Sequence, residues 1–224
     1  MPNTLAFDIY GTLIDTHGVV VKLTDMVGER AQAFSQAWRE KQLEYTFRKG
    51  LMRAYENFAV CTSQSLDYTD AVMSTGLTNE QKATLMAEYR SLPAFEDVPE
   101  SLNAIRSAGH QLYAFSNGTA DAIETLLVTA SIRELFHGVV TVDDKQTFKP
   151  NPDVYQHFLN ISGSTAASVW LVSSNPFDII GAVTQDMRAA WVQRNPQVVF
   201  DPWGVEPTVT ISSLRDLVSE LNQS

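Results

Sequence analysis

The sequence predicts an α/β fold: a mostly parallel, doubly wound sheet that carries an inserted helical subdomain. Two observations lead to this prediction. Apolar runs at residues 5–7 and 169–172 end in polar side chains, as buried parallel strands do where they reach the carboxyl edge of a sheet. Between the first run and the strands that follow, residues 18–92 show the periodicity of amphipathic helices. A helical block therefore interrupts an alternating pattern of strands and helices.

Length and composition restrict the class of protein. The 224 residues are enough for one α/β domain with an inserted subdomain. The net charge of −10 argues against nucleic-acid or anionic-membrane partners, and it requires an anionic substrate to find a local basic pocket. The single cysteine, Cys61, cannot form an internal disulfide and fits a reducing compartment. No signal peptide opens the sequence, and no apolar run approaches the ~20 residues that cross a bilayer. We therefore expect a cytoplasmic protein.

The first strand is expected to place Asp8 at the edge of the sheet where open α/β sheets bind ligands. After this strand the chain becomes helical, and Pro93 ends the helical insertion. We expect a core formed by residues 1–15 and 93–224, and a cap subdomain formed by residues 16–92 that folds over the sheet edge. The helices expected in the cap are residues 18–27, 31–51, 66–74 and 79–89.

Strands and helices alternate again after the insertion. A helix at 99–107 ends near Gly109, and a strand follows at 111–115. The remaining expected elements are helices at 121–135 and 153–160, a strand at 139–143, the last sheet strand at 169–172, strand material at 188–194 and 208–211, and a final helix from Ser213.

Polar side chains are expected at the same sheet edge as the first strand's carboxylate. Ser116 and Asn117 follow a strand and precede a helix, where backbone N–H groups can bind an anion. Lys149 lies in an extended turn that Pro150 and Pro152 hold in front of another helix. From the residues alone, a turn without a ligand is an equally ordinary interpretation of Ser116 and Asn117, and a solvated loop lysine is the default interpretation of Lys149.

The stretch after the strand at 169–172 contains one carboxylate, Asp178, together with Ser173 and Asn175. One carboxylate with hydroxyls and an amide makes a poor cage for a hard cation, which prefers more charged oxygen ligands. The same groups can orient a carboxylate and a water molecule. We therefore expect neither a metal nor another cofactor at this edge.

Four motifs, in order along the chain, resemble those of the haloacid dehalogenase superfamily. They are Asp-x-Tyr-Gly-Thr-Leu-x-Asp from Asp8, Ser-Asn-Gly from Ser116, Lys-Pro-x-Pro-x-x-Tyr from Lys149, and Val-Ser-Ser-Asn-x-Phe-Asp from Val172. The segment Trp-Arg-x-Lys-Gln-Leu-Glu-Tyr at 38–45 is similar to that of the superfamily's (S)-2-haloacid dehalogenases. The resemblance covers essentially the whole chain and implies a Rossmann-like core with a helical cap, assembled as a homodimer.

The resemblance also implies a reaction. Asp8 would displace halide from C2 of a short (S)-2-haloalkanoic acid and form an ester, which water would hydrolyse to an (R)-2-hydroxyacid. Ser116 would bind the substrate carboxylate, and Lys149 would balance negative charge. The halide would leave toward Arg39, Asn117 and Phe177. The other implied site residues are Thr12, Tyr155, Ser173, Asn175 and Asp178, which hold Asp8, Lys149 and the water, and Tyr10, Leu43 and Phe58, which contact the substrate. Whether Asp178 or a network linked to the lysine activates the water stays open.

Tyr10 is the position that separates activities within the superfamily. Its phosphatases usually have a second Asp there, which protonates the leaving group. A phenol with a pKa near ~10 is a poor substitute for that acid, whereas a halide needs no proton to leave.

Two alternatives remain, a magnesium-dependent small-molecule phosphatase and a catalytically silent binding protein. The sequence does not select the halogen, and fluoroacetate stays among the possible substrates.

Overall fold

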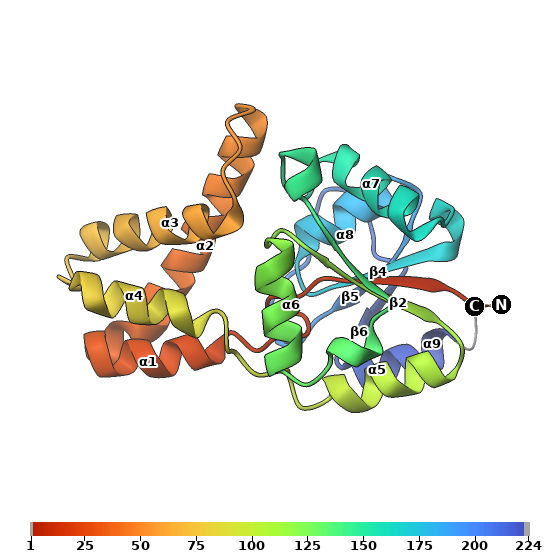
Figure 1. Ribbon diagram of the computed structural model, residues 1–224, viewed down its shortest axis with the longest axis horizontal. Helices are drawn as coiled ribbons and strands as arrows, with labels where there is room; N and C mark the ends of the chain where they lie inside the picture. The colour runs from red at the N-terminus through yellow and green to blue at the C-terminus, as the bar shows by residue number, and fades with distance from the viewer. Residues whose placement is uncertain (1, 222–224) are drawn as a thin grey trace.

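The computed structural model describes residues 2–221 and shows a sheet with helices on both faces and a helical group beside it (Figure 1). Six parallel strands are found within these residues, in the order β3-β2-β1-β4-β5-β6. The strands are β1 (Thr4–Phe7), β2 (Gln111–Ser116), β3 (Gly138–Thr141), β4 (Val169–Ser173), β5 (Arg188–Val192) and β6 (Val209–Ile211). The order reverses at β1, as in doubly wound Rossmann-like sheets. The predicted fold class is confirmed.

The strand β1 is the centre of the core because both of its faces are covered. Leu5 and Phe7 face one hydrophobic cluster and Ala6 faces another, and all three are fully buried. The first cluster includes side chains of α5, α6 and α9, and the second includes those of α7 and α8. These helices are α5 (Val98–Ser107), α6 (Ala120–Thr129), α7 (Pro152–Ser162), α8 (Pro176–Val183) and α9 (Leu214–Leu221). Since parallel strands buried on two faces need apolar side chains throughout, β1 is apolar until it ends at Asp8.

The helical group is inserted directly after β1. It consists of α1 (His17–Val27), α2 (Ala31–Leu51), α3 (Phe58–Met73) and α4 (Asn79–Glu88), and it lies to one side of the sheet (Figure 1). The two segments that connect it to the sheet run antiparallel: the Asp15 N–H donates to the Pro93 carbonyl at 2.8 Å, and Ile14 pairs with Ala94. The chain therefore enters and leaves the helical group at one place.

Three expected elements differ from the observed ones. The helix α3 begins at Phe58 rather than at residue 66, because its first two turns bury hydroxyl side chains such as Thr62 and lack an apolar period. The helix α6 ends at Thr129, and the chain turns at Ser131, where φ is +58°. The expectation that 169–172 is the last sheet strand is wrong: β4 pairs with β1 and β5, and the sheet continues to β6.

No helix within residues 2–221 combines the length and the apolar character that spanning a membrane requires. The one cysteine, Cys61, is buried and free.

A buried ion pair supports the loop after β1. Arg194 donates to the Thr12 carbonyl from Nη2 at 2.7 Å and from Nε at 3.1 Å, and its Nη1 lies 3.0 Å from Asp97 Oδ1. Asp97 also accepts hydrogen bonds from the Leu214 N–H and the Ser213 hydroxyl, both at 2.8 Å. Burial acts to raise the pKa of Asp97, but these donors and the guanidinium outweigh it and lower the pKa below its ordinary value. The pair thus joins β5, α5 and α9 to the loop that follows the central strand.

We predict that Asp97→Asn lowers the free energy of unfolding by about 3 kcal/mol at pH 7, because the amide leaves the partly buried charge of Arg194 uncompensated. Since the pKa of Asp97 is lowered in the folded state, the carboxylate stabilises the fold above the unfolded-state pKa of ~3.9, and this stabilisation is lost as the pH falls through the folded-state pKa. Urea unfolding followed by circular dichroism at pH 7 and pH 3 measures both effects. The exposed Asp25→Asn is the control, and a deficit that is equal at both pH values would contradict the prediction.

Candidate active site

Asp8 lies at the carboxyl end of β1, in the middle of the sheet edge, and is 8% exposed. Its N–H donates to the Val172 carbonyl at 3.0 Å, so the strand pairing continues up to this residue. Its Oδ2 accepts two hydrogen bonds of 2.8 Å, one from the Thr12 hydroxyl and one from the Asn175 side-chain amide. The Oδ1 atom lies 3.4 Å from Lys149 Nζ. One carboxylate oxygen is therefore held by neutral donors, and the other is close to a cation.

Lys149 is the buried cation of the site, with 1% of its surface exposed. Its Nζ donates to Asp178 Oδ2 and to the Phe115 carbonyl, both at 2.8 Å, and lies 4.1 Å from the centre of the Phe115 ring. Its backbone N–H donates to Asn117 Oδ1 at 3.0 Å. The expected alternative of a solvated loop lysine is therefore wrong, because the turn before α7 directs the side chain into the sheet edge.

Asp178 and Tyr155 fix the position of the Lys149 ammonium. Asp178, at the start of α8, is fully buried, and the Tyr155 hydroxyl from α7 donates to its Oδ1 at 2.8 Å. Burial raises the pKa of Asp178, and the neighbouring ammonium of Lys149 opposes this change. Burial together with the negative charge of Asp178 raises the pKa of Tyr155 well above its ordinary value, so the phenol stays protonated and acts as a donor.

The turn between β4 and α8 is joined to the loop after β1. Ser173 Oγ accepts the Asn175 N–H at 3.1 Å, which shapes the turn. The Ser174 N–H donates to Thr12 Oγ1 at 2.9 Å, and the Ser174 hydroxyl donates to the Gly11 carbonyl at 2.9 Å. Ser174 is absent from the residues selected from the sequence, because nothing in its local pattern distinguishes it from its neighbours.

Arg39 reaches the site from α2 of the helical group. Its Nη2 donates to Asn175 Oδ1 at 3.2 Å, so a single amide side chain contacts both the guanidinium and the carboxylate of Asp8. Its Nη1 donates to Gln42 Oε1 at 3.1 Å, and Gln42, fully buried, donates to the Thr62 hydroxyl at 2.6 Å. Sequence reasoning missed Gln42, although its position three residues after Arg39 on a helix was an available signal. The Arg39 side chain is thus partly buried rather than solvated on the surface.

Aromatic side chains form further contacts between the helical group and the sheet edge. Phe177 packs edge-on against Phe47 of α2, with ring centres 5.2 Å apart. Tyr10 stacks on Phe58, at the start of α3, with ring centres 5.9 Å apart. Burial raises the pKa of Tyr10, so its phenol is neutral. Leu43 is half-buried one turn beyond Arg39. Phe47 is a second residue that the sequence did not single out.

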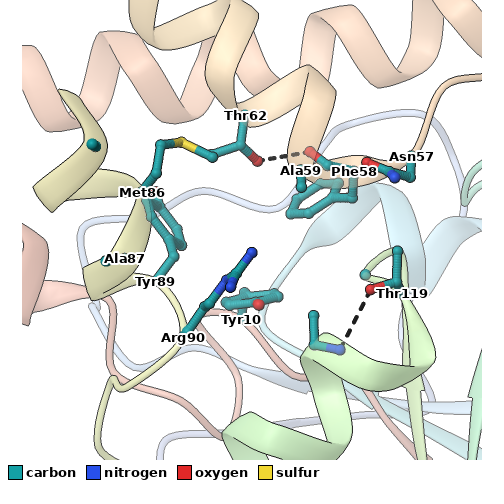
Figure 2. Close-up of a pocket in the computed structure, with 13 residues that line it drawn as sticks. Tyr10, Asn57, Phe58, Ala59, Thr62, Met86, Ala87, Tyr89, Arg90 and Thr119 are labelled. Atoms are coloured by element: carbon teal, nitrogen blue, oxygen red, sulfur yellow. Dashed lines mark hydrogen bonds between the residues drawn. The ribbon is translucent and has the colours of Figure 1, made fainter. Parts of the chain in front are cut away.

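Ser116 and Asn117 are buried at the end of β2, as expected for a site at this edge. Ser116 Oγ accepts the Gly118 N–H at 3.0 Å. Close to this turn, a cavity of about 470 Å³ lies between α3 and α4 of the helical group and the start of α6 (Figure 2). Tyr10, Phe58 and Gly118 line it, but Asp8 does not. The cavity therefore adjoins the cluster around the carboxylate without including it.

The cluster is suited to nucleophilic displacement. Hydrogen bonds and neighbouring charges hold a carboxylate in a fixed orientation, and a buried ammonium balances its charge. A guanidinium at the same edge can stabilise an anion that leaves. No group of three or more His, Cys, Asp or Glu side chains with the spacing of a metal site occurs within residues 2–221.

Comparisons with known proteins agree with this chemistry. The family model of the haloacid dehalogenase-like hydrolases matches residues 2–184. The chain is 34% identical over 214 residues to an (S)-2-haloacid dehalogenase of Pseudomonas sp. (strain YL), covering 96% of this chain and 92% of that protein. It is 32% identical to haloacetate dehalogenase H-2 of Moraxella sp. (strain B), covering 96% of each. The solved L-2-haloacid dehalogenase of Xanthobacter autotrophicus with chloropropionic acid covalently bound matches with a TM-score of 0.92 and 28% identity, over 99% of both chains.

We predict that Gly181→Ala destabilises the protein by about 1–3 kcal/mol, because a Cβ atom at this position of α8 would lie 2.3 Å from the Tyr155 hydroxyl oxygen. The clash would push the phenol away from Asp178. Urea unfolding of the variant and of Tyr155→Phe, which removes the hydroxyl without adding volume, separates overpacking from the lost hydrogen bond. If Gly181→Ala were as stable as the parent, the close packing of α7 against α8 would be wrong.

Proposed function

Since this chain belongs to the haloacid dehalogenase-like hydrolases, we propose that it hydrolyses the carbon–halogen bond of short (S)-2-haloalkanoic acids through an ester on Asp8. The observation that carries the proposal is the environment of this carboxylate, which Thr12 and Asn175 orient and Lys149 neutralises. Relatives named (S)-2-haloacid dehalogenases support it, as does the similar structure that holds covalently bound chloropropionic acid. The protein is thus a hydrolase that acts on carbon–halide bonds.

The first step forms the ester. Oδ1 of Asp8 attacks C2 of the substrate opposite the halogen, the carbon–halogen bond breaks, and the halide leaves with the bonding electron pair. The two hydrogen bonds to Oδ2 hold the carboxylate plane so that Oδ1 is presented to the substrate. Because attack occurs opposite the leaving group, the configuration at C2 is inverted. The step consumes no proton, which agrees with a tyrosine rather than an acid at position 10.

The second step hydrolyses the ester at the Cγ atom of Asp8. Water attacks Cγ, the bond between Cγ and the ester oxygen breaks, and the (R)-2-hydroxyacid leaves with that oxygen. One proton of the water goes to the product hydroxyl and the other to solvent, so the reaction releases one halide and one proton. Lys149 lies beside the negative charge of the tetrahedral intermediate, and Asp178 and Tyr155 keep its ammonium in place.

The remaining candidate residues have roles in binding. Ser116, with backbone N–H groups of its turn, binds the substrate carboxylate. The halide leaves toward Arg39, Asn117 and Phe177, and the interaction strengthens as charge builds on the halogen. Tyr10, Leu43 and Phe58 contact the rest of the substrate.

The helical insertion has a role of its own in the proposal. Residues 16–92 act as a cap that keeps water from the first step, and residues 1–15 and 93–224 form the catalytic core. Contacts of Arg39, Phe47 and Phe58 with the core support this division.

We also propose that the protein is a cytoplasmic homodimer. The buried, free Cys61 supports a reducing compartment, and the exposed Leu51 and Met52 at the end of α2 offer apolar surface to a second copy. Light scattering of the purified protein tests the assembly, with twice the monomer mass expected.

The proposed function is tested by halide release from (S)-2-chloropropionate, (R)-2-chloropropionate and fluoroacetate, each with and without EDTA. Chloride from the (S) acid alone, unchanged by EDTA, is the expected result. Fluoride release would extend the activity to fluoroacetate, a haloacetate like the substrates named for the Moraxella relative. Hydrolysis of an aryl phosphate that needs magnesium, with no halide released from any acid, would instead identify a phosphatase.

We predict that Asp8→Asn lowers halide release from (S)-2-chloropropionate by at least about 10³-fold, because a neutral amide is a poor nucleophile. Thermal unfolding should show a folded protein. The matched control is Asp15→Asn in the same motif, whose carboxylate accepts the His17 N–H. Undiminished release from Asp8→Asn would eliminate the ester mechanism.

We predict that Arg39→Gln lowers kcat for (S)-2-chloropropionate by about 10²-fold and changes KM much less, because the guanidinium acts on the charge that develops as the halide leaves. Arg48→Gln on the same helix is the control, since Arg48 is exposed and pairs with Glu44. Steady-state kinetics of chloride release measures both parameters. A change confined to KM would place Arg39 in ground-state binding instead.

A further inference from the structure

The cavity of Figure 2 has mainly apolar walls and one charged lining residue. Phe58, Met86 and Ala122 and other small or apolar side chains line most of its surface. Arg90, in the turn after α4, is the one lining residue with a formal charge. An apolar cavity that contains one cation suits a ligand with an apolar chain and an anionic end.

Arg90 is available for such a ligand. Its side chain is exposed, and Figure 2 shows it directed into the cavity, over Tyr10 and toward Phe58. Within residues 2–221 its guanidinium has neither an ion pair nor a hydrogen bond, although Asp121 lines an adjoining hollow that Arg90 also lines. A ligand in the cavity can therefore reach this cation without breaking an ion pair.

The cavity is also continuous with residues that contact the substrate in the proposed function. Tyr10 and Phe58 form one wall, and Gly118 follows directly on the turn of Ser116 that binds the substrate carboxylate. The methyl group of 2-chloropropionate would leave most of about 470 Å³ empty, since a volume of this size holds a complete small molecule. A longer substituent on C2 would extend from this wall toward Arg90.

We propose that this cavity is a subsite for the substrate's side chain and that it takes 2-halo-α,ω-dicarboxylic acids, whose second carboxylate pairs with Arg90. This proposal rests on the proposed function and specifies the class of substrate for the same site. The reaction is unchanged: Asp8 displaces halide from C2, water hydrolyses the ester, and the product is a 2-hydroxydicarboxylic acid. The charged pair contributes binding energy far from the reacting carbon, and thereby raises kcat/KM for the diacid.

The test compares two acids of equal length, (S)-2-bromohexanoate and (S)-2-bromoadipate, which differ in the charge at the far end. The expected kcat/KM for bromide release is about tenfold higher for the adipate. Arg90→Gln should lower the adipate value by about tenfold and the hexanoate value by less than twofold, which abolishes the preference, while Arg90→Lys retains part of it. Lys22→Gln removes the same charge from an exposed position on α1 and should leave both values unchanged.

A parent enzyme without preference for the adipate would overturn the proposal, and so would an Arg90→Gln variant that affects both acids equally. Ala122→Phe fills the cavity from α6 and should lower turnover of both six-carbon acids relative to (S)-2-chloropropionate. If Ala122→Phe leaves the turnover of the six-carbon acids relative to (S)-2-chloropropionate unaltered, the substituent on C2 of the substrate does not lie in this cavity. Turnover of (S)-2-chloropropionate distinguishes failure of the proposed function from failure of the subsite. If the protein does not turn over this acid, the proposed function is wrong. If it does, the results above test the subsite alone.

Discussion

The buried ammonium of Lys149 is the interaction on which the rest of the site depends. An isolated charge inside a protein is very costly, so its position is stable only because Asp178, Asp8 and the Phe115 carbonyl surround it. These partners come from the carboxyl ends of β1 and β2 and from the start of α8, which follows β4. The position of the lysine therefore requires the sheet order that is observed.

Asn175 extends this arrangement to the helical group. Its side chain donates to Asp8 and accepts from Arg39, so one amide links the Asp8 carboxylate to α2 by hydrogen bonds. Gln42 fixes the other side of the same guanidinium. A movement of α2 would therefore change the surroundings of the Asp8 carboxylate directly.

Part of this site could be predicted from the sequence, and the reason differs from residue to residue. Asp8 and Ser116 were found because each follows an apolar run, and strand ends meet at one sheet edge. Lys149 needed more than local pattern, because an exposed and a buried lysine look alike in a turn; the family resemblance selected between them. Ser174, Phe47 and Arg194 were missed, since each acts through a contact with residues far away in the chain. The strand material at 188–194 and 208–211 was expected, but its place in the sheet beyond β4 was not, because strand pairing joins residues far apart in the chain.

By itself, the sequence determined the α/β class, the place of the helical insertion and the chemical identity of the residues at the sheet edge. These depend on hydrophobic period and turn chemistry, which act over a few neighbouring residues. Only the tertiary structure decided that Arg39 contacts Asn175, 136 positions away in the chain, and that Arg194 contacts Thr12, 182 positions away. The cavity between α4 and α6 likewise appears only in the tertiary structure. Contacts of this kind are set by how whole elements pack against one another, and a local pattern carries no information about distances between elements.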